Sequence, residues 1–125
     1  FHDDHSIDFN SLKRLIDHVV SGGVDYLVVL GTTGESATLT SAEKKQVLKA
    51  CLEYNDGRVP VMLGIGGNNT QAVLDEIEST DFYGVAALLS VSPYYNKPSQ
   101  AGIIAHYTAV ADASPAPVVL YNIPG

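Results

Sequence analysis

Four segments of the chain carry apolar residues at intervals of three and four, which is the spacing of one helix face. The first covers residues 9–21 and stops at Gly22-Gly23. The second follows Thr40-Ser41-Ala42-Glu43, where Thr40 and Glu43 predict a capping box, and Asn55-Asp56-Gly57 closes it. Asparagine and hydroxyl side chains are predicted to cap the other two helices: Asn69 or Thr70, and Ser99. The inner face of the fourth helix is expected to hold Ile103, Ile104, Tyr107, Val110 and Ala111.

Four apolar runs lie between these helices and are predicted to be strands: residues 26–30, 59–65, 84–91 and 117–121. Each run is apolar at nearly every position instead of alternating, which indicates strands buried on both faces. Buried strands joined by helices pair in parallel. The sequence therefore predicts one α/β domain over residues 1–125, built either as a doubly wound sheet or as an arc of a (β/α)8 barrel.

In both architectures ligands bind at the carboxyl ends of the strands. The segments that follow the four predicted strands are all rich in hydroxyl, amide and glycine groups: Gly31–Glu35, Gly64–Asn69, Ser92–Pro98 and Tyr121–Gly125. Chemistry is therefore expected at this end of the sheet.

Composition narrows the classes of partner. The net charge of −7, from 14 acidic and 7 basic residues, argues against nucleic acid or an anionic membrane as a partner. No apolar run approaches the roughly 20 residues of a membrane-spanning helix. Cys51 is the single cysteine, so no disulfide within the chain and no thiol metal cluster is predicted, and Cys51 is expected in the core. A reducing cytoplasm fits this usage.

Three known kinds of site are not supported by the sequence: a dinucleotide turn, a metal site and a Schiff-base lysine. Gly64-Ile65-Gly66-Gly67 resembles part of a dinucleotide turn, but Asn69 stands where the third glycine belongs and no acidic residue ends the next strand. The histidines lack ligand spacing, so no metal site is predicted. Lys97 lies in a polar loop between Asn96 and Pro98, where we expect it to be solvated instead of forming a Schiff base.

The turn Gly31–Glu35 and three tyrosines are better candidates for a functional site. The turn places two threonine hydroxyls and free backbone N–H groups where a strand ends, which suits a carboxylate or phosphate. Tyr94 and Tyr95 follow one strand and Tyr121 ends another, so a phenol there could move a proton, with Thr32 as a link. The alternative is that each ring only packs, with its O–H on a backbone partner.

Three motifs taken in order identify a family. Gly31-Thr32-Thr33-Gly34-Glu35-Ser36-Ala37-Thr38-Leu39, Ser92-Pro93-Tyr94-Tyr95-Asn96-Lys97-Pro98-Ser99-Gln100 and Leu120–Gly125 resemble the dihydrodipicolinate synthase family of pyruvate-dependent class I aldolases. The resemblance runs in register over the whole chain. It implies a (β/α)8 barrel, of which this chain would be strands two to five, and a lyase of lysine biosynthesis in the cytoplasm. The activity implied is condensation of pyruvate, held as a Schiff base, with aspartate-4-semialdehyde, without a cofactor.

The resemblance also implies roles for individual residues. Thr33 matches the residue that binds the pyruvate carboxylate. Thr32, Tyr95 and Tyr121 match the three residues of a proton relay, in which Tyr121 is the proton donor. The tyrosine matching Tyr95 reaches into a neighbouring subunit, which implies a homodimer or homotetramer. Ala37, Asn68 and Tyr94 match positions around a lysine feedback site at the dimer interface. Ala72 stands where that site usually has an acidic residue, which puts lysine inhibition in question.

The family's Schiff-base lysine is expected on a strand after Gly125, so the 125 residues alone are expected to be inactive. Two other functions remain open. One is another keto-acid aldolase of the superfamily, of the N-acetylneuraminate lyase or sugar-acid type, and the other is a non-catalytic half-barrel that serves only in assembly.

Overall fold

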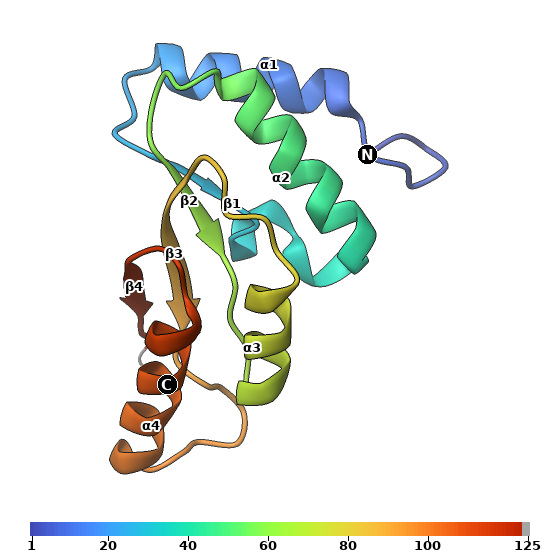
Figure 1. Ribbon diagram of the computed structural model, residues 1–125. Coiled ribbons are helices and arrows are strands. Elements are labelled where there is room, and N and C mark those ends of the chain that lie inside the picture. Colours follow the sequence, from blue (N-terminus) through green and yellow to red (C-terminus); the bar gives the residue numbers. More distant parts are fainter. Residues whose placement is uncertain (124–125) are drawn as a thin grey trace.

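The computed structural model describes residues 1–123 and contains a four-stranded parallel sheet whose strand order follows the chain, β1-β2-β3-β4 (Figure 1). Pro124 and Gly125 of the third motif lie outside the described residues. A doubly wound sheet reverses its strand order at a switch point, whereas a barrel adds each strand beside the last. This order is that of a barrel arc. The elements are α1 Phe9–Ser21, β1 Leu27–Val29, α2 Ser41–Asn55, β2 Val61–Gly64, α3 Thr70–Glu78, β3 Val85–Val91, α4 Gln100–Ala113 and β4 Val118–Tyr121.

The helix starts are fixed by side chains that bind free N–H groups. The predicted capping box is confirmed: the Thr40 N–H donates to Glu43 Oε2 over 2.8 Å, and the Glu43 N–H donates to Thr40 Oγ1 over 3.3 Å. These bonds hold the pKa of the Glu43 carboxyl below its ordinary value. Asn69, and not Thr70, caps α3, and Ser99 caps α4 as predicted.

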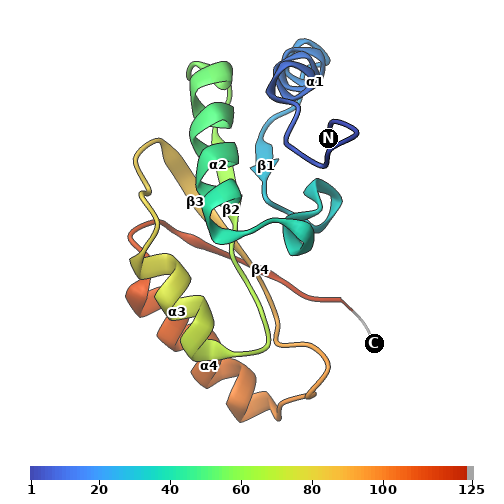
Figure 2. The same cartoon turned by 90° about the vertical axis from the view of Figure 1, so that its right-hand side faces the viewer.

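One hydrophobic core lies between the sheet and all four helices. Each helix contributes at least one buried side chain, and these pack over alternate residues of β1, β2 and β3. The core members on the helices are Ile16, Leu48, Cys51, Val73, Ile77 and Val110, and those on the strands are Leu27, Val29, Val61, Leu63 and Leu88. The helices therefore cover one face of the sheet, as Figures 1 and 2 show.

The opposite face of the sheet is open in the described part of the chain. Val28 of β1 is 50% exposed, and Val119 of β4 is 39% exposed. Val28 points away from the helices, because its strand neighbours Leu27 and Val29 are in the core. Val119 follows Val118, which packs against that core. The apolar character of both strand faces thus predicted parallel pairing correctly, but only the helix-covered face is buried within these residues.

The inner face of α4 differs from the prediction. His106 and Val110 are its buried residues, while Ile104 is 67% exposed and Ala111 is exposed. Residues 103, 106, 107 and 110 form one stripe, and 104 and 111 form another, because a spacing of seven returns to the same helix side. His106 Nδ1 lies 2.9 Å from Thr70 Oγ1, and burial lowers the pKa of the imidazole.

Glycines at the end of β2 make room for backbone from both neighbouring strands. A β-carbon at Gly64 would lie 2.6 Å from the Leu30 carbonyl oxygen, and one at Gly66 would lie 2.8 Å from the Val91 nitrogen. These separations are shorter than any side chain tolerates. The glycine cluster that resembles a dinucleotide turn is therefore explained by close packing of three strand ends.

Candidate active site

The Gly31–Glu35 turn forms a short 3-10 helix, Thr32–Gly34, directly after β1. The Gly34 N–H donates to the Gly31 carbonyl over 2.9 Å, and the Glu35 N–H donates to the Thr32 carbonyl over 3.0 Å. The expectation that the turn keeps all its donors free is therefore wrong for these two groups, because the 3-10 helix uses them. The Thr32 and Thr33 side chains are exposed on this turn.

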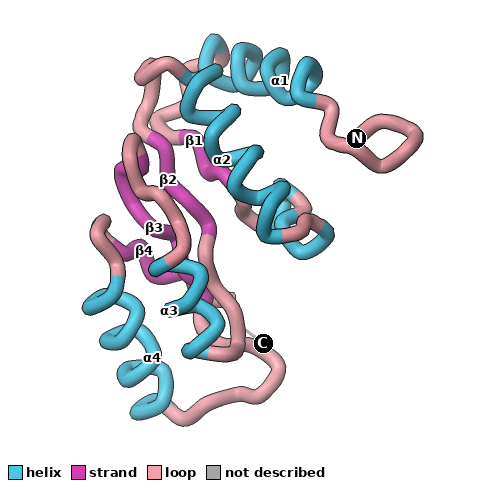
Figure 3. Tube along the Cα trace, turned by 45° about the vertical axis from the view of Figure 1, so that its right-hand side comes forward, coloured by secondary structure: helices cyan, strands magenta, loops and turns pink. Residues whose placement is uncertain are grey.

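A cavity of about 310 Å³ opens at the carboxyl ends of the strands, where the loops after β2 and β3 lie on the same side of the sheet (Figure 3). We call it the strand-end cavity. It is lined by four of the residues singled out from the sequence, namely Thr32, Ala37, Tyr94 and Tyr121. Residues from β1, β3 and β4 segments that are up to 89 positions apart thus meet at one site, as the parallel topology predicts.

The remaining candidates lie outside this cavity. Tyr95 is 91% exposed and adopts a left-handed backbone conformation, with φ of 72°. Lys97, with φ of 43°, is exposed as predicted. Positive φ in two bulky residues of one loop is unusual and is a form of backbone strain found at functional sites. Thr33 does not line the cavity, and Asn68 anchors this loop, because its carbonyl accepts from Asn96 Nδ2 over 3.3 Å.

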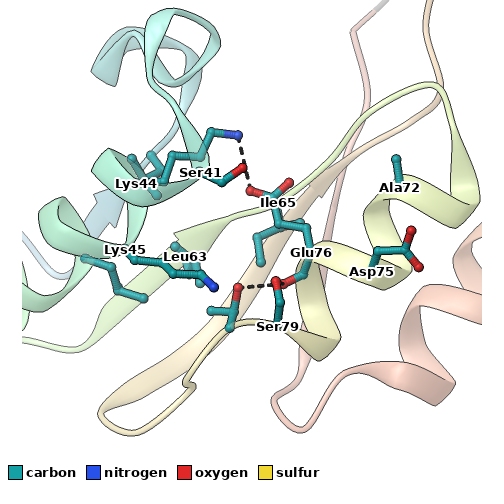
Figure 4. A pocket seen from close by; sticks show the side chains of 12 residues that line it. Ser41, Lys44, Lys45, Leu63, Ile65, Ala72, Asp75, Glu76 and Ser79 are labelled. Atoms are coloured by element: carbon teal, nitrogen blue, oxygen red, sulfur yellow. Dashed lines mark hydrogen bonds and ion pairs between the residues drawn. The ribbon is translucent and has the colours of Figure 1, made fainter.

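A second cavity of about 390 Å³ lies between α2 and α3 (Figure 4). Lys44 of α2 and Glu76 of α3 line both cavities and form an ion pair of 3.2 Å. Ala72 lines this second cavity, so a methyl group stands where the family resemblance places an acidic side chain. The strand-end cavity is the better candidate for chemistry, since the polar strand ends open into it.

Sequence reasoning missed three residues here. Lys44 and Glu76 are 32 positions apart, and no local pattern marks them as a pair. Tyr107 was expected only as an inward-facing helix residue, yet its phenol oxygen lies 3.0 Å from Ser92 Oγ at the end of β3. The one signal in the sequence was a polar hydroxyl on an otherwise apolar helix face.

The described residues contain neither a cluster of metal ligands nor a membrane-spanning helix. Within residues 1–123, no group of three or more His, Cys, Asp or Glu side chains is placed to hold a metal ion. No helix among these residues is long and apolar enough to cross a membrane.

Comparison with known proteins gives a consistent result. The model of the dihydrodipicolinate synthetase family matches residues 1–125. The 4-hydroxy-tetrahydrodipicolinate synthase of Flavobacterium psychrophilum is 56% identical over 125 residues, which is all of this chain and 43% of that protein. The chain thus spans less than half the length of this relative.

Solved structures agree. A dihydrodipicolinate synthase from Bacillus anthracis is 45% identical, with a TM-score of 0.93 over all of this chain and 43% of that one. The chloride-inhibited dihydrodipicolinate synthase from Acinetobacter baumannii, complexed with pyruvate, is 38% identical, with a TM-score of 0.91 over 98% of this chain and 42% of that one. The four-stranded sheet of this chain therefore corresponds to part of the (β/α)8 barrel of these enzymes.

Proposed function

Because the chain belongs to the dihydrodipicolinate synthetase family, we propose that the protein it forms part of condenses pyruvate with aspartate-4-semialdehyde in lysine biosynthesis. The observation that carries the proposal is the strand-end cavity, where Thr32 and Tyr121 meet although 89 positions separate them. A hydroxyl and a phenol in one cavity are the groups that a proton relay requires. The pyruvate complex of the Acinetobacter baumannii relative supports the first substrate.

In this proposal each residue has one task. Pyruvate binds as a Schiff base to a lysine in the part of the relatives' length that this chain does not cover, and the Thr33 hydroxyl holds its carboxylate. Tyr121 donates the proton near the Schiff base, with Thr32 as the link to Tyr95. Tyr95 fits a role in a neighbouring subunit's site, since it is 91% exposed and its loop is bent by two left-handed residues.

The same reasoning extends to assembly and control. A homodimer or homotetramer would cover Tyr95 and place Ala37, Asn68 and Tyr94 near a subunit interface. A feedback site for lysine there would lack an acidic ligand, because Ala72 cannot pair with an ammonium group. We therefore propose that lysine inhibits this protein weakly. The cytoplasm is the compartment that such a biosynthetic role implies.

A chimeric synthase tests the activity. In this chimera, residues 1–125 replace the matching segment of the Flavobacterium psychrophilum enzyme, to which they align over 125 residues. We expect the chimera to consume pyruvate with aspartate-4-semialdehyde, and the Thr33→Val variant to have a much higher KM for pyruvate. A chimera that folds but does not react with the semialdehyde would refute the proposal.

Two alternative functions, a sugar-acid aldolase and a non-catalytic assembly unit, can be tested with the same proteins. Turnover with sugar aldehydes in preference to the semialdehyde would favour a sugar-acid aldolase. For the third function, the 125-residue chain is studied alone: a soluble, uniform oligomer would favour an assembly unit, whereas aggregation would favour dependence on the rest of a barrel. Borohydride trapping with pyruvate should give no adduct on the chain alone.

A further inference from the structure

Tyr107 joins the ends of two strands through a single oxygen atom. Its phenol lies on α4, 3.0 Å from Ser92 Oγ, 3.1 Å from the Ser90 carbonyl oxygen and 3.2 Å from the Tyr121 carbonyl oxygen. Ser90 belongs to β3, Ser92 follows it, and Tyr121 is the last residue of β4. The helix residue therefore bridges the two strands at the edge of the strand-end cavity.

The protons of this group can be assigned by counting. A phenol has one O–H donor, and both carbonyls are acceptors only. If the phenol gave its proton to Ser92, neither carbonyl would receive a bond from Tyr107. The arrangement that uses all three contacts has the Ser92 hydroxyl donating to the Tyr107 oxygen, while the Tyr107 proton is shared between the Ser90 and Tyr121 carbonyls.

The backbone of Tyr121 is held against β3 at one atom, its carbonyl oxygen. The last bond of the ladder between β3 and β4 runs from the Ser92 N–H to the Tyr121 carbonyl over 2.8 Å. Tyr107 supplies the second bond to that same carbonyl oxygen. The Tyr121 side chain lines the strand-end cavity, and the position of its backbone sets where the phenol can reach.

We propose that Tyr107 is a positioning residue: its phenol fixes the backbone of Tyr121 against β3 and thereby aims the Tyr121 phenol into the strand-end cavity. The proposal rests on the proposed function, in which Tyr121 donates a proton. Tyr107 touches no substrate in this scheme. Its effect is transmitted through the Tyr121 carbonyl, and it leaves the Thr33 side of the site, on the turn after β1, unaffected.

Tyr107→Phe in the chimeric synthase removes only the oxygen atom. We expect kcat to fall on the order of tenfold, because small misplacements of a reacting group cost up to about 100-fold. The KM for pyruvate should stay within about twofold, since Thr33 holds the carboxylate from a different strand. Tyr83→Phe is the matched control: Tyr83 is 87% exposed, and the same change there should alter neither constant.

A purely structural role for Tyr107 predicts a different pattern, namely a lower melting temperature with unchanged kcat below it. That result would overturn the proposal. If Tyr107→Phe does not fold, Ser92→Ala provides the second variant, because it removes the hydroxyl that donates to the Tyr107 oxygen and frees the phenol to turn. We expect a smaller loss of kcat in the same direction, and an unchanged kcat would count against the assigned role.

Amide hydrogen exchange separates this proposal from the proposed function. Exchange at the Ser92 N–H should be faster in Tyr107→Phe than in Tyr83→Phe, because the carbonyl that it binds loses its second anchor. An inactive parent chimera would refute the proposed function, whereas equal exchange at Ser92 in the two variants would refute the role of Tyr107 whether or not the parent is active.

Discussion

The carbonyl oxygen of Leu30 occupies the space that a side chain at position 64 would need. A β-carbon there would lie 2.6 Å from this oxygen, and Leu30 itself has φ of 60°, which is unusual for a bulky residue. The backbone that leads into the Gly31–Glu35 turn is therefore bent over β2, and glycine at position 64 leaves room for the bend.

We expect Gly64→Ala to lower the stability of the chimeric synthase by about 1–3 kcal/mol, the usual cost of forcing atoms into a packed site. The Thr32 and Thr33 hydroxyls would move with the Leu30 backbone, so activity should fall as well. Thermal unfolding and turnover measure the two effects. Gly67→Ala is the control, because its β-carbon would lie an ordinary 3.6 Å from Val73 Cγ2. Equal losses in both variants would contradict this account.

His106 predicts how stability depends on pH. Burial lowers the pKa of this imidazole in the folded protein below its ordinary value of 6.5. The unfolded chain then takes up a proton first as the pH falls, so the contribution of neutral His106 is complete above pH 6.5 and is lost as the pH falls through the lower, folded pKa. The melting temperature should fall from pH 7 to pH 5, and less steeply in His106→Gln than in the parent. Thr108→Ala, which changes an exposed residue without a titratable group on the same helix, should keep the parent's slope.

The thiol of Cys51 should not react with thiol reagents in the folded protein. It is 4% exposed, and burial raises the pKa of its thiol to about 11. The thiolate is the reactive form, so labelling at pH 8 requires opening of the α2 core. We expect a disulfide reagent to leave the Cys51 peptide unmodified, as read by mass spectrometry, until denaturant is added. A cysteine introduced by Thr108→Cys on the exposed side of α4 should react at once under the same conditions.

The capping box of α2 carries a measurable share of stability. Thr40→Ala removes the oxygen that accepts from the Glu43 N–H, and we expect a loss of about 1 kcal/mol, typical of a threonine cap. Thr108→Ala makes the same chemical change in the middle of α4, where alanine favours the helix, and should not destabilise. A melting temperature unchanged by Thr40→Ala would show that α2 is held by tertiary packing alone.

Most of the fold could be predicted from the chain itself, because its local signals agree. Apolar spacing placed all four helices, two of the four helix caps (Thr40 and Ser99) were assigned uniquely, and the uniformly apolar runs predicted parallel strands. The failures are long-range. Ile104 was expected in the core because apolar residues on α4 outnumber those that one face can hold, and spacing alone did not say that the polar His106 would lie inside instead.

The site was harder to predict than the fold. The strand ends were recognisable as polar segments, and four candidate residues do line one cavity. The turn after β1 was expected to have unused N–H groups because the tendency of Gly31-Thr32-Thr33-Gly34 to close a 3-10 helix was not considered. The Lys44–Glu76 pair and the bridge made by Tyr107 connect separate elements, and such contacts leave no periodic trace in a sequence.

The strand order has a consequence for synthesis of the protein. Because every strand pairs with the one made just before it, the sheet can grow one unit at a time as the chain leaves the ribosome, and domains generally fold in that direction. The Gly31–Glu35 turn forms early, but Tyr121 joins it only when β4 has docked. A ribosome that stalls between α4 and β4 would therefore hold a nascent chain in which the edge of β3 is unpaired, and such an edge is a target for chaperones.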